Sequence, residues 1–270
     1  MNDAVHAEAA RVDVVRGELV IDGRRLSYLD FGGTGRPLLA LHGHLSEGAV
    51  WTGLAAELGP DWRVIAPDQR GQGESERAAD YSREGYLADI EALLDHLGLE
   101  RAVLLGHSLG AINAYQFAAR HPERVEAIVN VEGPLVLGLE GPHPLAFLLG
   151  LPYDAPSRDG LVAELGPAAP YFADRLRENP DGSWRLPFHP KDMYDSEELV
   201  HGDHWADWTA TGCPALLVRG TEGVIPAGQA AEAVSRRPGA AAVELVGDHL
   251  LPISAAGELA ATVREFLVKL

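Results

Sequence analysis

The chain has 270 residues, of which 46% are hydrophobic, and a formal net charge of −18 at pH 7. This length can bury a sizeable core, either as one large domain or as a domain that carries an insertion. The acidic balance argues against a nucleic-acid partner, which would need clustered Lys and Arg on the surface, and it disfavours highly anionic substrates.

The cysteine content and the N-terminal sequence bear on the compartment. A single cysteine, Cys213, excludes an internal disulfide and a cysteine-based zinc site. Residues 1–10 lack a basic region followed by an apolar one, and no window is long and apolar enough to span a bilayer. We therefore expect a cytoplasmic protein, a monomer or a homodimer, that does not insert into membranes and begins with a short frayed stretch.

Short apolar runs alternate with helical patterns along most of the chain, which indicates a mostly parallel sheet with helices on both faces. Helices are expected over residues 86–97 and 109–120 and from about residue 254 onward. The expected strands are residues 18–21, 26–31, 37–41, 63–67, 102–106, 127–131, 215–219 and 241–246.

One region, residues 134–208, breaks this alternation. It holds many prolines and large apolar side chains without a clean strand-helix rhythm. We interpret it as a helical cap inserted after the sixth strand, over a core formed by residues 1–133 and 209–270. Because a cap must present apolar surface to whatever it covers, we expect a few of its aromatic residues to face a pocket.

Histidines inside the cap raise the question of a metal site. His201 and His204 lie close together in the sequence, and His189 and Asp192 precede them. A metal needs a closed set of ligands, and no distant residue supplies a partner at a diagnostic spacing. We therefore expect these residues to pack the cap or line the pocket, with no metal bound.

The strongest motif is Gly106-His107-Ser108-Leu109-Gly110, which directly follows an expected buried strand and directly precedes an expected helix. A Gly-x-Ser-x-Gly turn in this context holds the serine in a strained conformation, with its hydroxyl exposed beside the helix N-terminus. Developing negative charge is stabilised there. Ser108 is therefore the candidate nucleophile.

A serine needs a base that takes its proton. The chain has 11 histidines. Among them, His249 follows the last expected strand and precedes the final helix, so it would lie at the same sheet edge as Ser108. His107 lies inside the serine motif and is expected to pack beside it.

With these residues the chain resembles the α/β-hydrolase superfamily over essentially its whole length. Residues 106–110 resemble the nucleophile elbow, residues 41–44 (Leu-His-Gly-His) the oxyanion loop, and residues 67–75 the turn after the fourth strand. The resemblance implies an eight-stranded, mostly parallel sheet flanked by helices. Haloalkane dehalogenases and epoxide hydrolases are disfavoured, because those relatives have Asp at the position of Ser108.

The resemblance also implies further site residues. The backbone N–H groups of His44 and Leu109 would bind an oxyanion. The side chain of His44 would face the pocket. Apart from the resemblance, we expect Trp51, His107 and Trp205 to line this pocket, since a cap presents apolar surface to what it covers.

The carboxylate that completes the triad has two candidates. In most of the superfamily it lies three residues beyond a glycine after the seventh core strand, but three residues beyond Gly220 is Gly223. Glu222 is one residue short of that position. A shift by one residue near a strand end turns a side chain to the opposite face, although a loop deletion could absorb the shift.

The rival is Glu132, which ends the sixth expected strand at the start of the cap. It lies 24 residues after Ser108. Relatives with their acid after the sixth strand place it at this distance, so the resemblance favours Glu132 and leaves Glu222 as the alternative. Asp248 is a third candidate, although adjacent residues rarely present side chains to each other in the required geometry.

The sequence therefore predicts a serine hydrolase with a cap and no required cofactor. It would cleave an ester, thioester or lactone of a neutral, hydrophobic small molecule. The same fold also supports carbon–carbon bond hydrolases, lyases and cofactor-free oxygenases, and a ligand-binding protein with vestigial hydrolysis is a further alternative.

Overall fold

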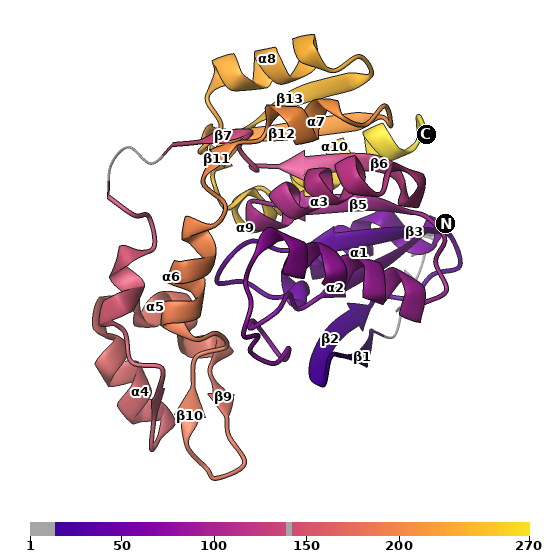
Figure 1. Ribbon diagram of the computed structural model, residues 1–270. Helices are drawn as coiled ribbons and strands as arrows, with labels where there is room; N and C mark the ends of the chain where they lie inside the picture. The colour runs from indigo at the N-terminus through magenta and orange to yellow at the C-terminus, as the bar shows by residue number, and fades with distance from the viewer. Residues whose placement is uncertain (1–13, 139–141) are drawn as a thin grey trace, which may run out of the picture.

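An eight-stranded sheet forms the centre of the molecule (Figure 1). The computed structural model describes residues 14–138 and 142–270, so the expected frayed start and residues 139–141 of the cap lie outside the described residues. The strand order is β1-β2-β4-β3-β5-β6-β12-β13, with β1–β2 and β2–β4 antiparallel and the other neighbours parallel. The strands are β1 (Val15–Ile21), β2 (Arg24–Asp30), β3 (Arg36–Leu41), β4 (Trp62–Pro67), β5 (Ala102–His107), β6 (Val125–Val131), β12 (Ala215–Glu222) and β13 (Ala240–Asp248).

All eight expected strands are thus confirmed, and the alternation of side chains explains why their central members are apolar throughout. In β3, Leu39 and Leu41 belong to one buried apolar cluster, whereas Leu38 and Ala40 belong to another on the opposite face. Successive side chains of a strand point to opposite faces, so a strand covered on both sides needs a continuous apolar run.

Helices cover both faces of the sheet. Residues from three of them, α2 (Arg83–His96), α3 (Leu109–Arg120) and α8 (Ala227–Arg236), contribute to one cluster. Two others, α1 (Thr52–Leu58) and α10 (Ala256–Leu267), contribute to the other. No helix in the described part of the chain is long and apolar enough to cross a membrane.

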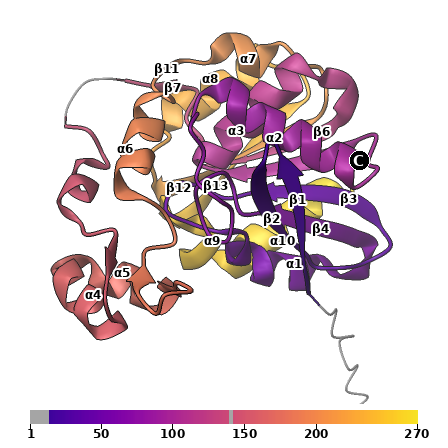
Figure 2. The same cartoon turned by 60° about the horizontal axis from the view of Figure 1, so that its bottom comes forward.

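The segment between β6 and β12 contains the expected cap, most of which lies to one side of the sheet in Figures 1 and 2. Its two ends pair as β7 (Val136–Leu137) and β11 (Gly202–Asp203). The helices are α4 (Arg158–Leu165), α5 (Ala169–Phe172) and α6 (Pro190–Glu198). A three-stranded antiparallel sheet of β8 (Asp154–Ala155), β10 (Trp184–Arg185) and β9 (Arg177–Glu178) accompanies them. The cap is therefore not purely helical; strands of two residues are too short to show a periodicity in the sequence.

The last part of the expected cap packs on the core instead. Helix α7 (Trp205–Thr209) lies against α3. Its Trp208 is fully buried and donates from Nε1 to the carbonyl of Ala233 in α8 (3.1 Å). The Trp205 ring lies under the Arg236 guanidinium, 4.4 Å from its Cζ. These aromatic residues therefore belong structurally to the sheet-covering layer.

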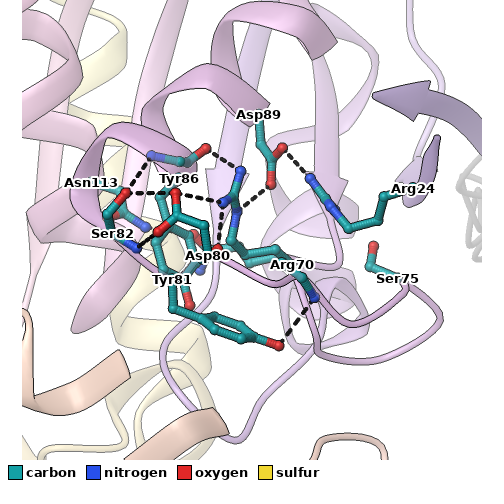
Figure 3. A network of polar contacts seen from close by, with 12 residues as sticks. Arg24, Arg70, Ser75, Asp80, Tyr81, Ser82, Tyr86, Asp89 and Asn113 are labelled. Carbon is teal, nitrogen blue, oxygen red and sulfur yellow. Dashed lines mark hydrogen bonds and ion pairs between the residues drawn. The ribbon is translucent and has the colours of Figure 1, made fainter. Parts of the chain in front are cut away.

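The turn after β4 is held by a buried polar network (Figure 3). Arg70 donates from Nε to Asp89 in α2 (2.8 Å) and from Nη1 to the carbonyl of Asp80 (2.7 Å). Asp89 also accepts from Arg24 at the start of β2 (2.5 Å). These partners give Arg70 a structural role: it ties the turn to α2 and the sheet.

Candidate active site

Ser108 lies in a strained turn between β5 and α3. Its φ is 51° and its ψ −119°, a conformation that costs roughly 1–3 kcal/mol for a residue other than glycine. The turn needs glycine on both sides. A Cβ on Gly106 would lie 2.2 Å from the carbonyl oxygen of Gly110, and a Cβ on Gly110 would lie 2.2 Å from that of Leu41. The motif therefore fixes the serine through backbone packing.

Leu109 is the first residue of α3, directly after Ser108. The first N–H groups of a helix have no partner inside the helix, and they carry the positive end of its dipole. The backbone at Leu109 is thus suited to stabilise negative charge that develops near the serine.

Glu132 occupies the start of the next loop along the sheet edge. It is fully buried and adopts a φ of 54°, a second strained position. Its Oε1 accepts from the N–H of Gly220 (2.7 Å), and its Oε2 accepts from the N–H of Val224 (2.6 Å). The Nδ1 of His249 lies 3.2 Å from the same Oε2. A buried carboxylate needs such partners, and here they aim it at the histidine.

Gly223 stands where most of the superfamily has the acid of the triad, and its surroundings explain why no side chain is present there. A Cβ at Gly223 would lie 2.2 Å from Oε1 and 2.3 Å from Oε2 of Glu132, so the missing side chain leaves space for the Glu132 carboxylate. Strand β12 continues to Glu222, which is exposed and pairs in register with Asp248 of β13. The structure therefore brings Glu132 to His249 and leaves Glu222 at the surface.

His107 positions the backbone of His249. Burial, with smaller effects led by the charge of His249, lowers the pKa of His107 from 6.5 to about 3, so the ring is neutral. Its Nε2–H then donates to the carbonyl of His249 (2.8 Å), and the two rings lie 4.9 Å apart. The residue before Ser108 thus holds the loop that carries His249.

The loop of residues 41–44, which is expected to be the oxyanion loop, lies against Ser108. A Cβ on Gly43 would lie 3.1 Å from Cβ of Ser108 and 2.8 Å from Nδ1 of His107, so only glycine fits this close approach. Burial lowers the pKa of His42 to about 4. The neutral His42 ring accepts from the N–H of Gln69 (2.9 Å) and donates from Nδ1 to the carbonyl of Gly43 (2.7 Å). These contacts fix the loop that leads to His44.

The side chain of His44 connects this loop to the cap. Its Nδ1 lies 2.9 Å from Oε2 of Glu197, and its Nε2 lies 2.9 Å from Oγ of Ser196, both in α6. Burial raises the pKa of Glu197. The hydrogen bond and charge of His44, together with the charges of His201 and His143, lower this pKa by more, so the net shift is downward. Glu197 is therefore ionised, and its carboxylate holds the His44 ring.

A cavity of about 1000 Å³ lies beside this edge of the sheet, between core and cap. His44, His107 and Leu250 line it on the core side; the last two are sequence neighbours of Ser108 and His249, which are not themselves part of the lining. The cap contributes mostly apolar residues, among them Phe147, Leu151, Leu165, Tyr171, Phe172 and the charged Arg175. The cavity is thus a mainly apolar chamber that reaches the sequence neighbours of Ser108 and His249.

Two residues expected in the pocket lie elsewhere. Trp51 is fully buried in the apolar cluster on the α1 and α10 face. Trp205 packs in α7 against the core. The expectation that these tryptophans line the cavity is therefore corrected, because a tryptophan that fills the core is not available to a substrate.

Two of the histidines considered as metal ligands, His204 and His189, lie beside protein groups. His204 donates from Nε2 to the carbonyl of Val200 (2.8 Å). His189 lies 3.4 Å from Asp192, whose carboxylate is bound by Arg77 (2.8 Å). Within residues 14–138 and 142–270, no three His, Cys, Asp or Glu side chains are grouped so that they could hold a metal ion.

Comparison with known proteins assigns the chain to a family. The family model described as "alpha/beta hydrolase fold" matches residues 36–250, and the chain belongs to this family. The chain is 38% identical over 133 residues to 2-hydroxymuconate semialdehyde hydrolase of Pseudomonas sp. strain CF600, covering 46% of this chain and 47% of the relative. It thus spans about half or less of the length of the first curated relatives it matches.

Two further matches cover nearly the whole chain. The 2-(acetamidomethylene)succinate hydrolase of Mesorhizobium japonicum is 28% identical over 256 residues, which are 90% of this chain and 89% of the relative. A crystal structure of E-2-(acetamidomethylene)succinate hydrolase aligns with a TM-score of 0.79 at 25% identity, covering 94% of this chain and 99% of that one. These two matches extend the similarity to α/β-hydrolase proteins over nearly the whole chain.

The role of Gly223 can be tested with Gly223→Ala. The added methyl group would displace the Glu132 carboxylate, so we expect turnover to fall about 100-fold, the cost of misplacing a catalytic group by about 1 Å. Gly228→Ala in α8, where a Cβ meets nothing within 4 Å, is the matched control. Equal turnover by the two variants in steady-state kinetics would contradict this role of Gly223.

The buried histidines predict acid sensitivity. His42 and His107 have folded-state pKa values of about 4 and about 3, below the unfolded value of 6.5. The unfolded state therefore takes up protons first, and folding stability falls as the pH drops below about 6.5 toward these values. Between pH 7.5 and 5 we expect a loss of roughly 1–2 kcal/mol for each ring.

Urea unfolding at pH 7.5 and 5 measures this loss. In His107→Phe, which keeps an aromatic ring but cannot be protonated, the loss should be smaller by roughly 1–2 kcal/mol. An unchanged pH dependence in this variant would show that His107 does not resist protonation as described.

Proposed function

We propose that this protein is a serine hydrolase that cleaves an ester, thioester or lactone of a hydrophobic small molecule through an acyl-enzyme. The proposal rests above all on one observation: His249 at the serine-bearing sheet edge faces a buried Glu132 carboxylate. Ser108 is the nucleophile, His249 the general base and acid, and Glu132 the carboxylate that orients the imidazole.

The reaction proceeds in two halves. With Nδ1–H directed to Glu132, Nε2 of His249 is left to accept the hydroxyl proton as Oγ of Ser108 attacks the carbonyl. The tetrahedral intermediate collapses when the imidazolium returns this proton to the leaving alcohol or thiol. A water then attacks the acyl-enzyme and gives its proton to His249. The imidazolium returns this proton to Oγ of Ser108 as the second tetrahedral intermediate collapses, which releases the carboxylic acid and restores the serine hydroxyl.

The oxyanion of each intermediate would be bound by the backbone N–H groups of His44 and Leu109. The tight contact between Gly43 and Ser108 supports this assignment for the loop, and the N-terminus of α3 supports it for Leu109. Donors fixed before the reaction lower the barrier because no reorganisation is needed as charge develops. This chemistry uses protein groups alone and needs no cofactor.

Carbon–carbon bond hydrolysis is the second candidate. It is favoured by the similarity to 2-hydroxymuconate semialdehyde hydrolase, although the alignment covers only 46% of this chain. In that reaction the leaving group is a carbanion equivalent, which must be protonated as the bond breaks. The same His249 could deliver that proton, so a substrate screen of esters, lactones and ring-cleavage products separates the two candidates.

The nucleophile is tested with a fluorophosphonate probe. We expect the wild-type protein to be labelled and to hydrolyse aryl esters, and Ser108→Ala to lose both properties while its thermal unfolding is unchanged. A folded wild-type protein that is not labelled and turns over no ester would remove the proposed function.

The acid is tested by comparing two glutamine variants. Glu132→Gln should lower kcat by about 10³-fold or more, because an amide no longer stabilises the charged imidazole. Glu222→Gln should stay near wild type, since the Glu222 side chain is exposed. The reverse pattern in steady-state kinetics, with both variants shown to be folded, would assign the role to Glu222.

A further inference from the structure

A cationic side chain, Arg175, lines the otherwise mainly apolar cap wall of the cavity. It follows α5 and is partly buried. The Phe172 ring lies under its guanidinium, 5.6 Å from Cζ. Placing a cation here is costly unless something compensates its charge.

Backbone groups satisfy only part of this guanidinium. Nη1 donates to the carbonyl of Leu45 (2.7 Å), and Nη2 donates to that of Tyr171 (3.2 Å). A guanidinium has five N–H donors, so these two bonds leave further donors for a ligand. Among residues 14–138 and 142–270, Arg175 forms no ion pair.

The acidic residue that lines the same cavity is engaged elsewhere. Glu47 also lines the cavity, but its Oε2 binds Nη2 of Arg177 at 2.5 Å, and Arg177 reaches Glu74 as well. Burial lowers the pKa of Arg175, the charge of Glu47 raises it, and that of Arg177 lowers it, with a net downward shift. The Arg175 cation is therefore only partly compensated by the protein.

The hydrogen bond of Arg175 ties its charge to the loop that carries His44. Its partner Leu45 directly follows His44, the proposed oxyanion donor, and Leu45 has a φ of 61° that its hydrogen bond to Arg175 helps to hold. The same cavity reaches His107, the neighbour of Ser108. A molecule in the cavity can thus present one end to the serine and another to the guanidinium.

We propose that the cavity takes an apolar substrate that carries one carboxylate, and that Arg175 binds this carboxylate. The inference rests on the proposed function, because it assumes that the scissile carbonyl lies at Ser108. The apolar part of the substrate packs on cap side chains such as Leu151 and Phe172, and Glu47 disfavours a second negative charge. The neutral substrate expected from the net charge is thereby replaced by a monoanion.

A purely structural role for Arg175 makes a different prediction. If Arg175 only fastens the cap to Leu45, its loss should weaken the binding of neutral and anionic ligands by the same factor. If Arg175 binds a carboxylate, its substitution should weaken the binding of the anionic ligand more than that of the neutral ligand. The ratio between two matched ligands therefore separates the two roles, even where the variant also loses some overall activity.

The kinetic experiment compares 4-nitrophenyl butyrate with the mono-4-nitrophenyl ester of glutaric acid, which adds a terminal carboxylate. We expect the wild-type protein to prefer the glutarate ester in kcat/KM. In Arg175→Met the glutarate-to-butyrate ratio should fall by about 30-fold, and Arg175→Lys should restore part of it. An unchanged ratio in Arg175→Met overturns the proposal.

Arg158→Met provides the matched control. Arg158 is another cap arginine that donates to a backbone carbonyl, that of Ala173 (3.0 Å), and it does not line the cavity. Its substitution should leave the ratio unchanged. An equal fall in Arg158→Met would assign the effect to the charge of the cap as a whole and overturn the specific role of Arg175.

A binding experiment separates this inference from the proposed function. Calorimetry with 4-phenylbutyrate and the neutral 4-phenylbutyramide needs no turnover. The wild-type protein should bind the carboxylate at least about tenfold more tightly, and Arg175→Met should lose this preference. Equal affinity of the wild type for both ligands, or no binding of either, overturns the inference, whereas failure of ester turnover and probe labelling removes only the hydrolase mechanism.

Discussion

The buried carboxylate of Glu132 is the constraint on which the site depends. It accepts backbone hydrogen bonds from the end of β12 and the loop after it, and it faces His249 from the loop after β13. One side chain thus joins three loops at the same edge of the sheet. Gly223 leaves space for the carboxylate, and the left-handed backbone at Glu132 directs it there. Removing either condition would leave a buried charge without its partners, which is costly.

Much of this arrangement could be predicted from the sequence. The eight strands are predictable because each is a short apolar run. The serine turn is predictable because only glycine fits at positions 106 and 110, where a Cβ would clash with the backbone. The position of Glu132 after the sixth strand was favoured by its spacing from Ser108. The sequence could not show which side chains meet. In the sequence, Gly223 stands where most of the superfamily has its acid, and only the structure shows that the absence of a side chain there leaves space for the Glu132 carboxylate.

The cap was the least predictable region, for a physical reason. Its strands are two residues long and its helices short, so no periodicity marks them. Trp51 and Trp205 are large aromatic residues that suit a pocket and a core equally, and the structure uses them in the core. The roles of Arg175 and Glu197 could not be predicted from the sequence, because a lone charged residue in a loop or helix usually faces solvent. Here they hold the cap against the loop that carries His44.

The central claim is that Glu132 holds the Nδ1 proton of His249. Proton NMR in water observes this directly, because a hydrogen-bonded imidazole N–H that exchanges slowly gives a signal far downfield of the amide region. We predict such a signal in the wild-type protein and in Glu222→Gln, and its loss in Glu132→Gln and in His249→Ala. A signal that persists in folded Glu132→Gln and disappears in Glu222→Gln would contradict the account.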